Sequence, residues 1–510
     1  MQSNSTFKER LAGYAKSIAD NKVVLLFVAL CLFGVAFSGK PVSLTVTEVF
    51  TRFGRNAFLV LALIIPVLAG LGLNFGIVVG AIAAQIAIFC TVYWGFTGVK
   101  GILMCVLICT PLAILFGYLV GALFNKTKGT EMITGLVLGY FADGLYQLLF
   151  LFIIGGVIPV NNPTLIINGG VGVKNTIDLT GNLKYAIDTV SMLSVARVIF
   201  AVYMLITVVT LIVRLIRKGD LKLKATLVRT AIAVVVFGLT FIPFIRDFMS
   251  TDRLNLVNAV EIACVLAVVW AVGKFVCDKF ILKKEANLRK SIALIIAAGI
   301  AYGLTWVNPV YEVLKAVNIP VCTYLLIFML CFFNKWLLST KLGQDMRTVG
   351  QSRTVANAAG INVDRTRIIA MCISTVLASW GQLIFLQNLG TFSTYGAHTQ
   401  VGLYAIAALL VGGASVQRAN NKQAIIGIIL FHTLFVVAPL AASNLLGSAL
   451  IGEYFRVFVC YGVIAASLAM HAWKTHVKPR LKDDKGDGGA AAPGGTPEAA
   501  ALAQAEDTPV

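Results

Sequence analysis

Charged residues are scarce in this chain. Only 13% of its 510 residues are Asp, Glu, Lys or Arg, whereas an ordinary soluble domain holds about 25%. Together with a hydrophobic content of 58% and a mean hydropathy of +0.87, this scarcity excludes a soluble globular protein. Apolar runs long enough to cross a bilayer as helices recur from end to end. We therefore predict an all-α polytopic membrane protein with about 10–14 transmembrane helices, because a membrane β-barrel would show short alternating strands instead.

Motifs for catalysis and nucleotide binding are also missing. The stretch GGVGVKN at 169–175 lacks the Walker A spacing, and neither H-E-x-x-H nor G-x-S-x-G occurs. The four histidines are scattered, and the ten cysteines form no C-x-x-C pair. Because the cysteines lie mostly in apolar runs, we expect small buried hydrophobic residues rather than disulfides or metal ligands. The sequence thus predicts no catalytic residue, no metal site and no cofactor, and it offers no means of hydrolysing ATP alone.

Fourteen apolar segments set the predicted topology: 23–38, 57–72, 75–95, 101–125, 132–155, 191–213, 228–248, 254–276, 291–306, 320–338, 367–388, 401–416, 423–440 and 454–473. With the N-terminus placed inside, most inner loops are basic, as the positive-inside rule expects. The formal net charge of +19 is explained in this way. We predict no nucleic-acid partner, because no basic, aromatic-laced soluble domain exists to bind one.

Two features depart from this simple pattern. The segment 39–56 should lie outside, yet it carries Lys40, Arg52 and Arg55. The segments 57–72 and 75–95 are close together and contain Pro66 and several glycines, so one of them is expected to be broken or re-entrant. No convincing cleavable signal peptide is evident, and we predict an uncleaved first membrane helix.

The resulting division of the chain has seven parts. It comprises a cytoplasmic N-terminus at 1–22, a first helix group at 23–155, an extracytoplasmic loop at 156–190, further helices with a possible insertion at 191–340, a polar cytoplasmic loop at 341–366, C-terminal helices at 367–473, and a basic, then disordered, cytoplasmic tail at 474–510.

Residues 341–366, here called the polar segment, are the most informative stretch. Gly350 is predicted to break a first short helix and Gly360 to stop a second, which gives a compact helical unit presenting Arg347 and Arg353 to the cytoplasm. The alternative is a solvated connector whose arginines only fix the topology.

The order of residues in the polar segment closely resembles the cytoplasmic loop of bacterial ABC importer permeases of the branched-chain amino acid, ribose and simple-sugar class. Their pattern is G-x-x-[LF]-R-[AT]-V-G-x-[NS]-x-x-A-A-x-x-[AS]-G-I-N. The matching positions are Gly343, Arg347, Val349, Gly350, Ser352, Ala356, Gly360, Ile361 and Asn362, while Val355 replaces the first alanine. Weaker likenesses at 70–85, 126–145 and 402–415 follow in the family's order. Three extra apolar segments between about 214 and 319 depart from the usual fold of about eight to ten helices.

The resemblance implies a function and a set of partners. In the family this loop docks into a cleft on the ATPase subunit and transmits its closure. The implied coupling residues are Gly343, Arg347, Gly350, Arg353, Gly360 and Ile361. The implied partners are a separate ABC ATPase subunit, an extracytoplasmic solute-binding protein and a second permease chain, in the lipid of the bacterial inner membrane. A simple sugar or a nucleoside-like compound is the expected solute.

Polar residues inside apolar segments are candidates for the translocation path, because burying them in hydrocarbon is costly. Asp143 and Gln147 lie four residues apart on one helix face, with Tyr146 adjacent. The predicted path residues are Asn74, Gln85, Asp143, Tyr146, Gln147 and Gln382. The alternative is that they are hydrogen-bonding contacts between helices.

Two other classes of protein stay open. One is an ion-coupled secondary transporter of about fourteen helices, which would use Asp143 and Glu261 as coupling carboxylates. The other is a polytopic transferase acting on a lipid-linked substrate, which the missing catalytic motifs disfavour.

Overall fold

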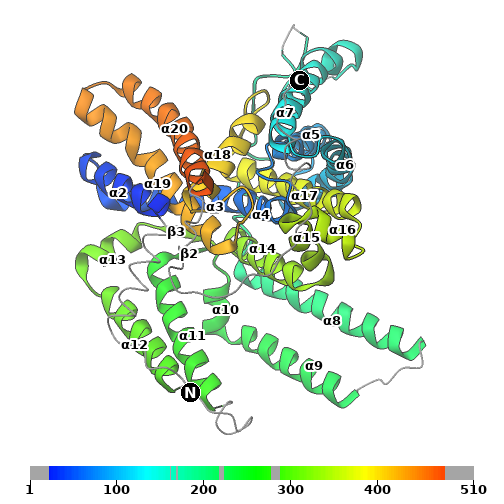
Figure 1. The fold of residues 1–510 in the computed structure, drawn as a ribbon. Helices are drawn as coiled ribbons and strands as arrows, with labels where there is room; N and C mark the ends of the chain where they lie inside the picture. Colours follow the sequence, from blue (N-terminus) through cyan, green and yellow to red (C-terminus); the bar gives the residue numbers. More distant parts are fainter. Residues whose placement is uncertain (1–21, 161, 168–170, 217–222, 277–287, 477–510) are drawn as a thin grey trace, which may run out of the picture. The chain divides into compact units, whose positions relative to one another are not determined.

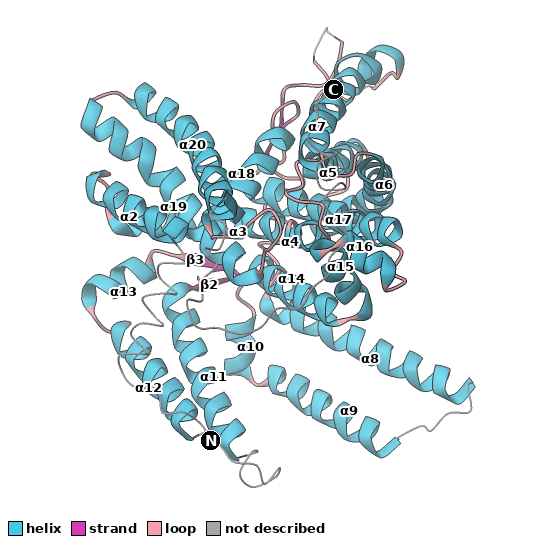
Figure 2. Ribbon diagram, in the orientation of Figure 1, coloured by secondary structure: helices cyan, strands magenta, loops and turns pink. Residues whose placement is uncertain are grey.

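A computed structural model describes residues 22–160, 162–167, 171–216, 223–276 and 288–476 (Figure 1). Helices dominate this part of the chain, and the strands are short (Figure 2). The predictions for residues 1–21 and for the tail from 477 onward lie outside the described residues. The all-α polytopic class is confirmed.

The first group of helices runs from the N-terminal side to residue 157. It consists of α2 (Lys22–Phe37), α3 (Val42–Ala62), α4 (Ile64–Leu68), α5 (Ile77–Tyr93), α6 (Gly98–Lys126), α7 (Glu131–Leu148) and the π-helix η1 (Leu149–Val157). After η1 the chain is mostly irregular until residue 190, apart from β1 (Thr176–Asp178).

The predicted outer loop at 39–56 is wrong. Residues 42–62 form the single helix α3, and α3 with α4 gives a candidate span of 27 residues. Arg52 lies 3.6 Å from the carboxylate of Glu48 and over the ring of Phe435. The Arg55 side chain donates to Oδ1 of Asn388 at 3.0 Å. These arginines disagreed with the positive-inside rule because they are helix residues with partners, not loop residues.

The middle of the chain supplies the segments that the family pattern did not accommodate. It contains α8 (Met192–Ile216), α9 (Leu223–Gly238), η2 (Leu239–Phe241), α10 (Pro243–Met249), β2 (Arg253–Asn255), α11 (Leu256–Val276), α12 (Leu288–Leu304), α13 (Asn308–Lys315) and β3 (Asn318–Pro320). The strands β2 and β3 pair antiparallel, with Arg253 opposite Pro320. We call residues 223–320 the insert. Its helices expose many apolar side chains, such as Val235, Leu266 and Ile300.

The last group follows the insert. It contains α14 (Val321–Ser339), α15 (Lys341–Gln351), α16 (Arg353–Ala358), α17 (Val363–Leu389), β4 (Thr391–Ser393), α18 (Ala397–Val411), α19 (Asn421–Leu446) and α20 (Ala449–His476). The strand β4 pairs antiparallel with β1, so the 156–190 region is joined to the turn after α17.

The helix α17 lies at the centre of the core and packs against α3, α5 and α6. Small residues permit the close approach. A Cβ atom added at Gly117 of α6 would lie 2.7 Å from Cα of Cys372, and one at Gly121 would lie 2.9 Å from Cα of Ile368. Such small-residue contacts are the usual way for membrane helices to pack backbone against backbone.

Glycines serve two different purposes in this fold. Gly80 and Gly412 are packing points, because an added Cβ would meet backbone atoms of a neighbouring helix at 2.7 Å and 1.9 Å. Gly70 and Gly72 instead have φ angles of +71° and +70° in the turn between α4 and α5. Glycine is needed there for the backbone conformation.

Among the described residues, nine helices are long and apolar enough to cross a membrane, judged by length and composition. A tenth candidate is the pair Ser291–Leu304 and Asn308–Lys315, which is bent by 85°. The shorter apolar helices Val23–Phe37, Ile77–Tyr93, Thr226–Phe241 and Ala397–Val411 account for the rest of the fourteen predicted segments. Because α3 and α4 count as one span and α5 is only a shorter apolar helix, the predicted interruption of 57–72 or 75–95 stays a prediction.

We predict that Gly427→Ala destabilises the fold, because its Cβ would lie 1.9 Å from the carbonyl oxygen of Ala408. Overpacking of this kind costs about 1–3 kcal/mol or more. Gly462→Ala is the matched control, since an added Cβ there meets nothing within 4 Å. The melting temperature in detergent should fall only for Gly427→Ala; equal melting temperatures would contradict this packing.

Candidate functional site

The polar segment is built from two short helices with defined starts. The side chain of Thr340 caps α15 by accepting from the Gly343 amide at 3.3 Å, and Ser352 caps α16 by accepting from the Val355 amide at 3.3 Å. Asn362 caps α17 in the same way, at 2.9 Å from the Arg365 amide. Because each of the three helices begins with a side-chain cap, the boundaries of this unit are encoded locally.

Gly350 does not break the first helix as predicted. The helix α15 continues to Gln351, and the break falls at Ser352, which has an extended backbone. An added Cβ at Gly350 would lie 2.2 Å from the carbonyl oxygen of Leu68 and 3.0 Å from the amide of Gly70. Gly350 is therefore the point at which the polar segment touches the turn after α4.

The remaining predicted coupling residues have distinct positions. Arg347 is exposed on α15. An added Cβ at Gly343 would meet the carbonyl oxygen of Leu337 of α14, so this residue permits close packing. Gly360 has a φ of +76° and ends α16 as expected. Ile361 packs inward with Val349, Ala356 and Val363.

Arg353 is turned toward the protein rather than presented to the cytoplasm. Its Nη2 and the Nη2 of Arg367 both donate to Oε1 of Glu131. The second carboxylate oxygen of Glu131 accepts from the Gly129 amide at 3.0 Å. Arg367 is fully buried. A single buried carboxylate thus joins the start of α7 to α16 and α17.

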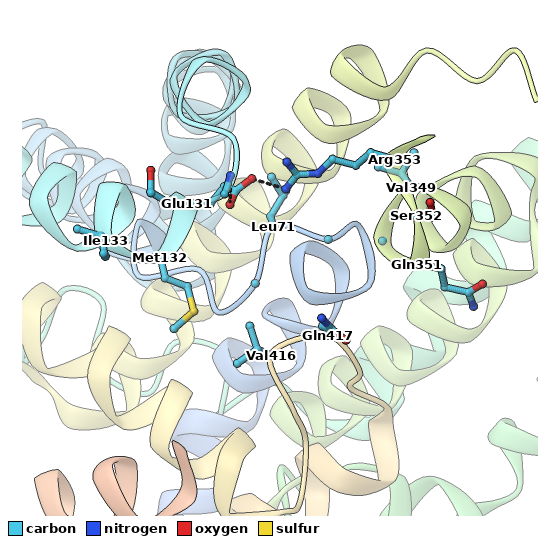
Figure 3. Close-up of a pocket in the computed structure, with 15 residues that line it drawn as sticks. Leu71, Glu131, Met132, Ile133, Val349, Gln351, Ser352, Arg353, Val416 and Gln417 are labelled. Carbon is cyan, nitrogen blue, oxygen red and sulfur yellow. Dashed lines mark hydrogen bonds and ion pairs between the residues drawn. The ribbon is translucent and has the colours of Figure 1, made fainter. Parts of the chain in front are cut away.

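A pocket of about 510 Å³ lies where the polar segment meets three turns (Figure 3). It is lined by residues 70–72, 129–133, 349–353 and 416–417. Figure 3 shows Glu131 and Arg353 facing each other across one side of it, while Val416 and Gln417 belong to the turn after α18. The polar segment therefore lies beside the ends of α4, α7 and α18.

A second group of polar residues lies further along α7. Oδ1 of Asp143 is 2.7 Å from Nε2 of His398, and its Oδ2 accepts from the Gln147 side chain at 3.1 Å. The ring of Tyr146 meets the ring of His398 at 4.9 Å. The one-face arrangement predicted for Asp143 and Gln147 is thus present, and α18 adds a histidine to it.

Gln85 and Gln382 lie at about the same level as this group. A Cβ at Gly135 of α7 would lie 3.3 Å from the amide of Gly76, which directly precedes α5. The helices α5 and α7 run in the same direction. Gln85 is nine residues beyond Gly76, and Gly144 is nine residues beyond Gly135, so Gln85 and Gly144 lie at the same height along the two helices. The side chain of Gln382 donates to the carbonyl of Ala397, next to His398, at 3.4 Å. We call Gln85, Asp143, Tyr146, Gln147, Gln382 and His398 the polar cluster.

Several polar atoms of this cluster have no protein partner within the described ranges. They are both amide atoms of Gln85, the hydroxyl of Tyr146, Oε1 of Gln382 and Nδ1 of His398. Unpartnered polar atoms are costly in an apolar interior. Asn74 is different: it lies near Gly76, level with Gly135, which at 1.5 Å per residue is about 12 Å from Asp143 along α7.

Sequence reasoning missed His398, Glu131 and Arg367. His398 and Asp143 are 255 residues apart, and Glu131 is 222 and 236 residues from its two arginines. No periodic pattern in the sequence connects residues so far apart. Glu261, the other carboxylate considered, lies on α11 of the insert and makes no ion pair with any residue that the structure describes.

Comparison with known proteins places this chain among transport proteins. Residues 220–468 match the family described as "Branched-chain amino acid transport system / permease component". The match includes the insert, which the sequence pattern had left unassigned. It does not reach 55–155, where the weaker likeness remains a prediction.

Three curated relatives are informative. The autoinducer 2 import system permease protein LsrC of Klebsiella pneumoniae is 29% identical over 120 residues, which are 22% of this chain and 35% of LsrC. The probable ABC transporter permease protein YphD of Escherichia coli is 28% identical over 169 residues, 32% of this chain and 48% of YphD. The xylose transport system permease protein XylH of Haemophilus influenzae is 32% identical over 91 residues, 18% of this chain and 24% of XylH.

Residues 220–468 are thus similar to the permease components of branched-chain amino acid transport systems, and shorter stretches are similar to the three permeases above. The chain is a multi-pass protein of the inner membrane. The matches cover only 24–48% of the length of these relatives. No solved structure matches the chain.

We predict that Glu131→Gln destabilises the protein strongly, because it leaves the buried Arg367 without its carboxylate. Removing one partner of a buried pair costs about 3–5 kcal/mol. Glu48→Gln is the control, since that carboxylate is half exposed and 3.6 Å from Arg52, and a surface pair contributes about 0–1 kcal/mol. Thermal unfolding in detergent measures both; a small, equal loss would refute the structural importance of Glu131.

Proposed function

We propose that the chain is the permease subunit of an ABC importer and forms the translocation path for a small polar solute, a simple sugar or a nucleoside-like compound. Two permease chains would enclose one path. Two ATPase subunits on separate chains would bind the polar segments, and an extracytoplasmic binding protein would deliver the solute. The names of the relatives, which include permeases for autoinducer 2 and for xylose, support a sugar-like solute.

The main observation behind this proposal is the structure of the polar segment. Its helices α15 and α16 are capped at both starts and packed inward through Met346, Val349 and Ala356, while Arg347 stays exposed. A rigid unit with an exposed cationic face suits docking to another protein better than a solvated connector does, because a connector needs no buried side. The family match extends over the whole unit.

The contacts of the polar segment provide a route for its movement. Arg353 is tied to α7 through Glu131, and Gly350 touches the turn between α4 and α5. Asp143 lies on α7, twelve residues beyond Glu131, or about 18 Å along a helix. We infer that displacement of the polar segment by the ATPase shifts α7 and α5 and thereby rearranges the polar cluster, as alternating access requires.

The polar cluster suits a hydroxyl-bearing solute. Amide and carboxylate groups with free hydrogen-bonding capacity recognise sugar hydroxyls, and aromatic rings such as Tyr146 provide stacking surfaces. The unpartnered atoms of Gln85, Gln382 and His398 are available for such bonds.

An ion-coupled secondary transporter is the second candidate. The observation that favours it is the contact between Asp143 and the buried His398, two titratable groups 2.7 Å apart. Such pairs inside membranes also occur in proton relays. In that case no ATPase would be needed.

For the polar segment, we predict that Arg347→Glu abolishes solute uptake and association with the ATPase while membrane insertion is kept. The change reverses the charge on the exposed docking face. Lys422→Glu, at the predicted inner end of α19 and also exposed, should leave uptake intact. The assay is uptake by cells that co-express candidate ATPase and binding-protein genes, with co-purification of the ATPase measured in parallel. Normal uptake by Arg347→Glu would count against docking there.

For the path, Asp143→Asn and His398→Gln should both reduce uptake at least tenfold, or about 1.4 kcal/mol, without loss of ATPase co-purification. Glu261→Gln should transport normally. If Glu261→Gln fails as well, and ion gradients alone drive uptake into proteoliposomes, the ion-coupled candidate is correct instead.

A further inference from the structure

A small polar pocket lies where the insert meets the core, on the side predicted to face outward. Its volume is about 150 Å³. The core contributes residues of α3, α14 and the end of α17. The predicted outer loop contributes Tyr185 and Asp188, and the paired strands β2 and β3 contribute Arg253, Asn318 and Pro320. Neither the sequence motifs nor the polar cluster involves this pocket.

The carboxylate in the pocket is already satisfied by neutral groups. Asp188 is buried, and its Oδ1 accepts from the hydroxyl of Thr323 at 2.5 Å and from the side chain of Gln387 at 3.0 Å. Its Oδ2 accepts from the side chain of Asn388 at 2.8 Å. The negative charge of Asp188 is therefore held by dipoles rather than by a cation.

Two guanidinium groups line the same pocket without a direct ion pair to a carboxylate. Arg55 donates its Nε to Oδ1 of Asn388 at 3.0 Å, and Arg253 lies over the ring of Tyr185 at 5.4 Å. Within the described ranges, neither forms an ion pair with Asp188, Asp252 or any other carboxylate. An arginine offers up to five donors in a planar fork that matches oxyanions.

The backbone is strained at the same place. Tyr185 has a φ of +55° and is the one non-glycine residue with positive φ in the part of the chain that the structure describes. Its amide is held by the carbonyl of Gln387 at 2.9 Å. Strained residues of this kind concentrate at ligand-binding sites, where surrounding contacts impose the conformation.

We propose that this pocket binds a small oxyanion, a phosphate that is either free in solution or the head group of a lipid. Arg55 and Arg253 would hold its oxygens, and Tyr185 would form one wall. The volume decides the class of ligand: pockets for drug-sized molecules measure about 300–1,000 Å³, so 150 Å³ admits an anionic group rather than a whole transported solute.

The bound anion would fasten the insert to the core. Arg253 lies on β2 of the insert, whereas Arg55 lies on α3 of the core. An oxyanion shared by the two arginines would link these elements and slow the separation of strands β2 and β3. This role is independent of the ATPase and of the transported solute.

The test uses the full chain in a phosphate-free maltoside detergent and follows hydrogen exchange of the peptides that contain 251–256 and 317–321. At an inorganic phosphate concentration about ten times its Kd, most sites are occupied. If the strands open only when the site is empty, hydrogen exchange of these peptides should slow about tenfold. Arg253→Gln should remove the effect, and Arg253→Lys should restore part of it. Arg246→Gln, an exposed arginine on α10, is the matched control and should respond like the natural chain.

The lipid arm replaces phosphate by phosphatidylglycerol or by phosphatidylcholine. Slowing by phosphatidylglycerol without slowing by inorganic phosphate assigns the site to a lipid head group, and slowing by inorganic phosphate assigns it to a free anion. If none of the three changes exchange, or if Arg253→Gln responds like the natural chain, the proposal is wrong.

Discussion

The contact of one buried carboxylate with two arginines holds together the side of this protein that is predicted to face inward. Glu131 receives Arg353 from the polar segment and Arg367 from the central helix α17. A buried carboxylate with a single arginine would join two elements, whereas two arginines make it the junction of three. Because Arg367 is fully buried, its charge has to be matched inside the protein, and this requirement fixes where the start of α7 lies.

This junction also determines how force could pass through the molecule. The glycine contact between α15 and the turn after α4 transmits compression only, since it is a steric contact between backbone atoms. The ion pair with Arg353 can also transmit tension, because separation would break a charge-assisted hydrogen bond to the buried Glu131. A docked partner could therefore both push and pull the helices that carry the polar cluster. A packed helix such as α7 conveys such movement over its length without needing a flexible hinge.

The sequence predicts those features that depend on local or periodic patterns. Hydropathy located the helices, and residue order located the polar segment, whose caps at Ser352 and Asn362 are local hydrogen bonds. The helix at 42–56 was missed because Arg52 and Arg55 mimic a loop until their partners are known. His398 and Glu131 were missed because their partners are distant in sequence, and a single sequence has no signal for such pairs.

Buried charge is balanced differently at the two ends of the bundle. At the predicted inner junction, Glu131 contacts both arginines directly, so that two guanidinium groups share one carboxylate. At the outer pocket, Asp188 takes only hydroxyl and amide donors, and Arg55 and Arg253 keep their charge. Had Asp188 been there to neutralise the arginines, the simplest arrangement would have been a direct ion pair. Hydrogen bonds from neutral groups instead leave the guanidinium donors of the outer pocket available to a separate anion, as a binding site requires.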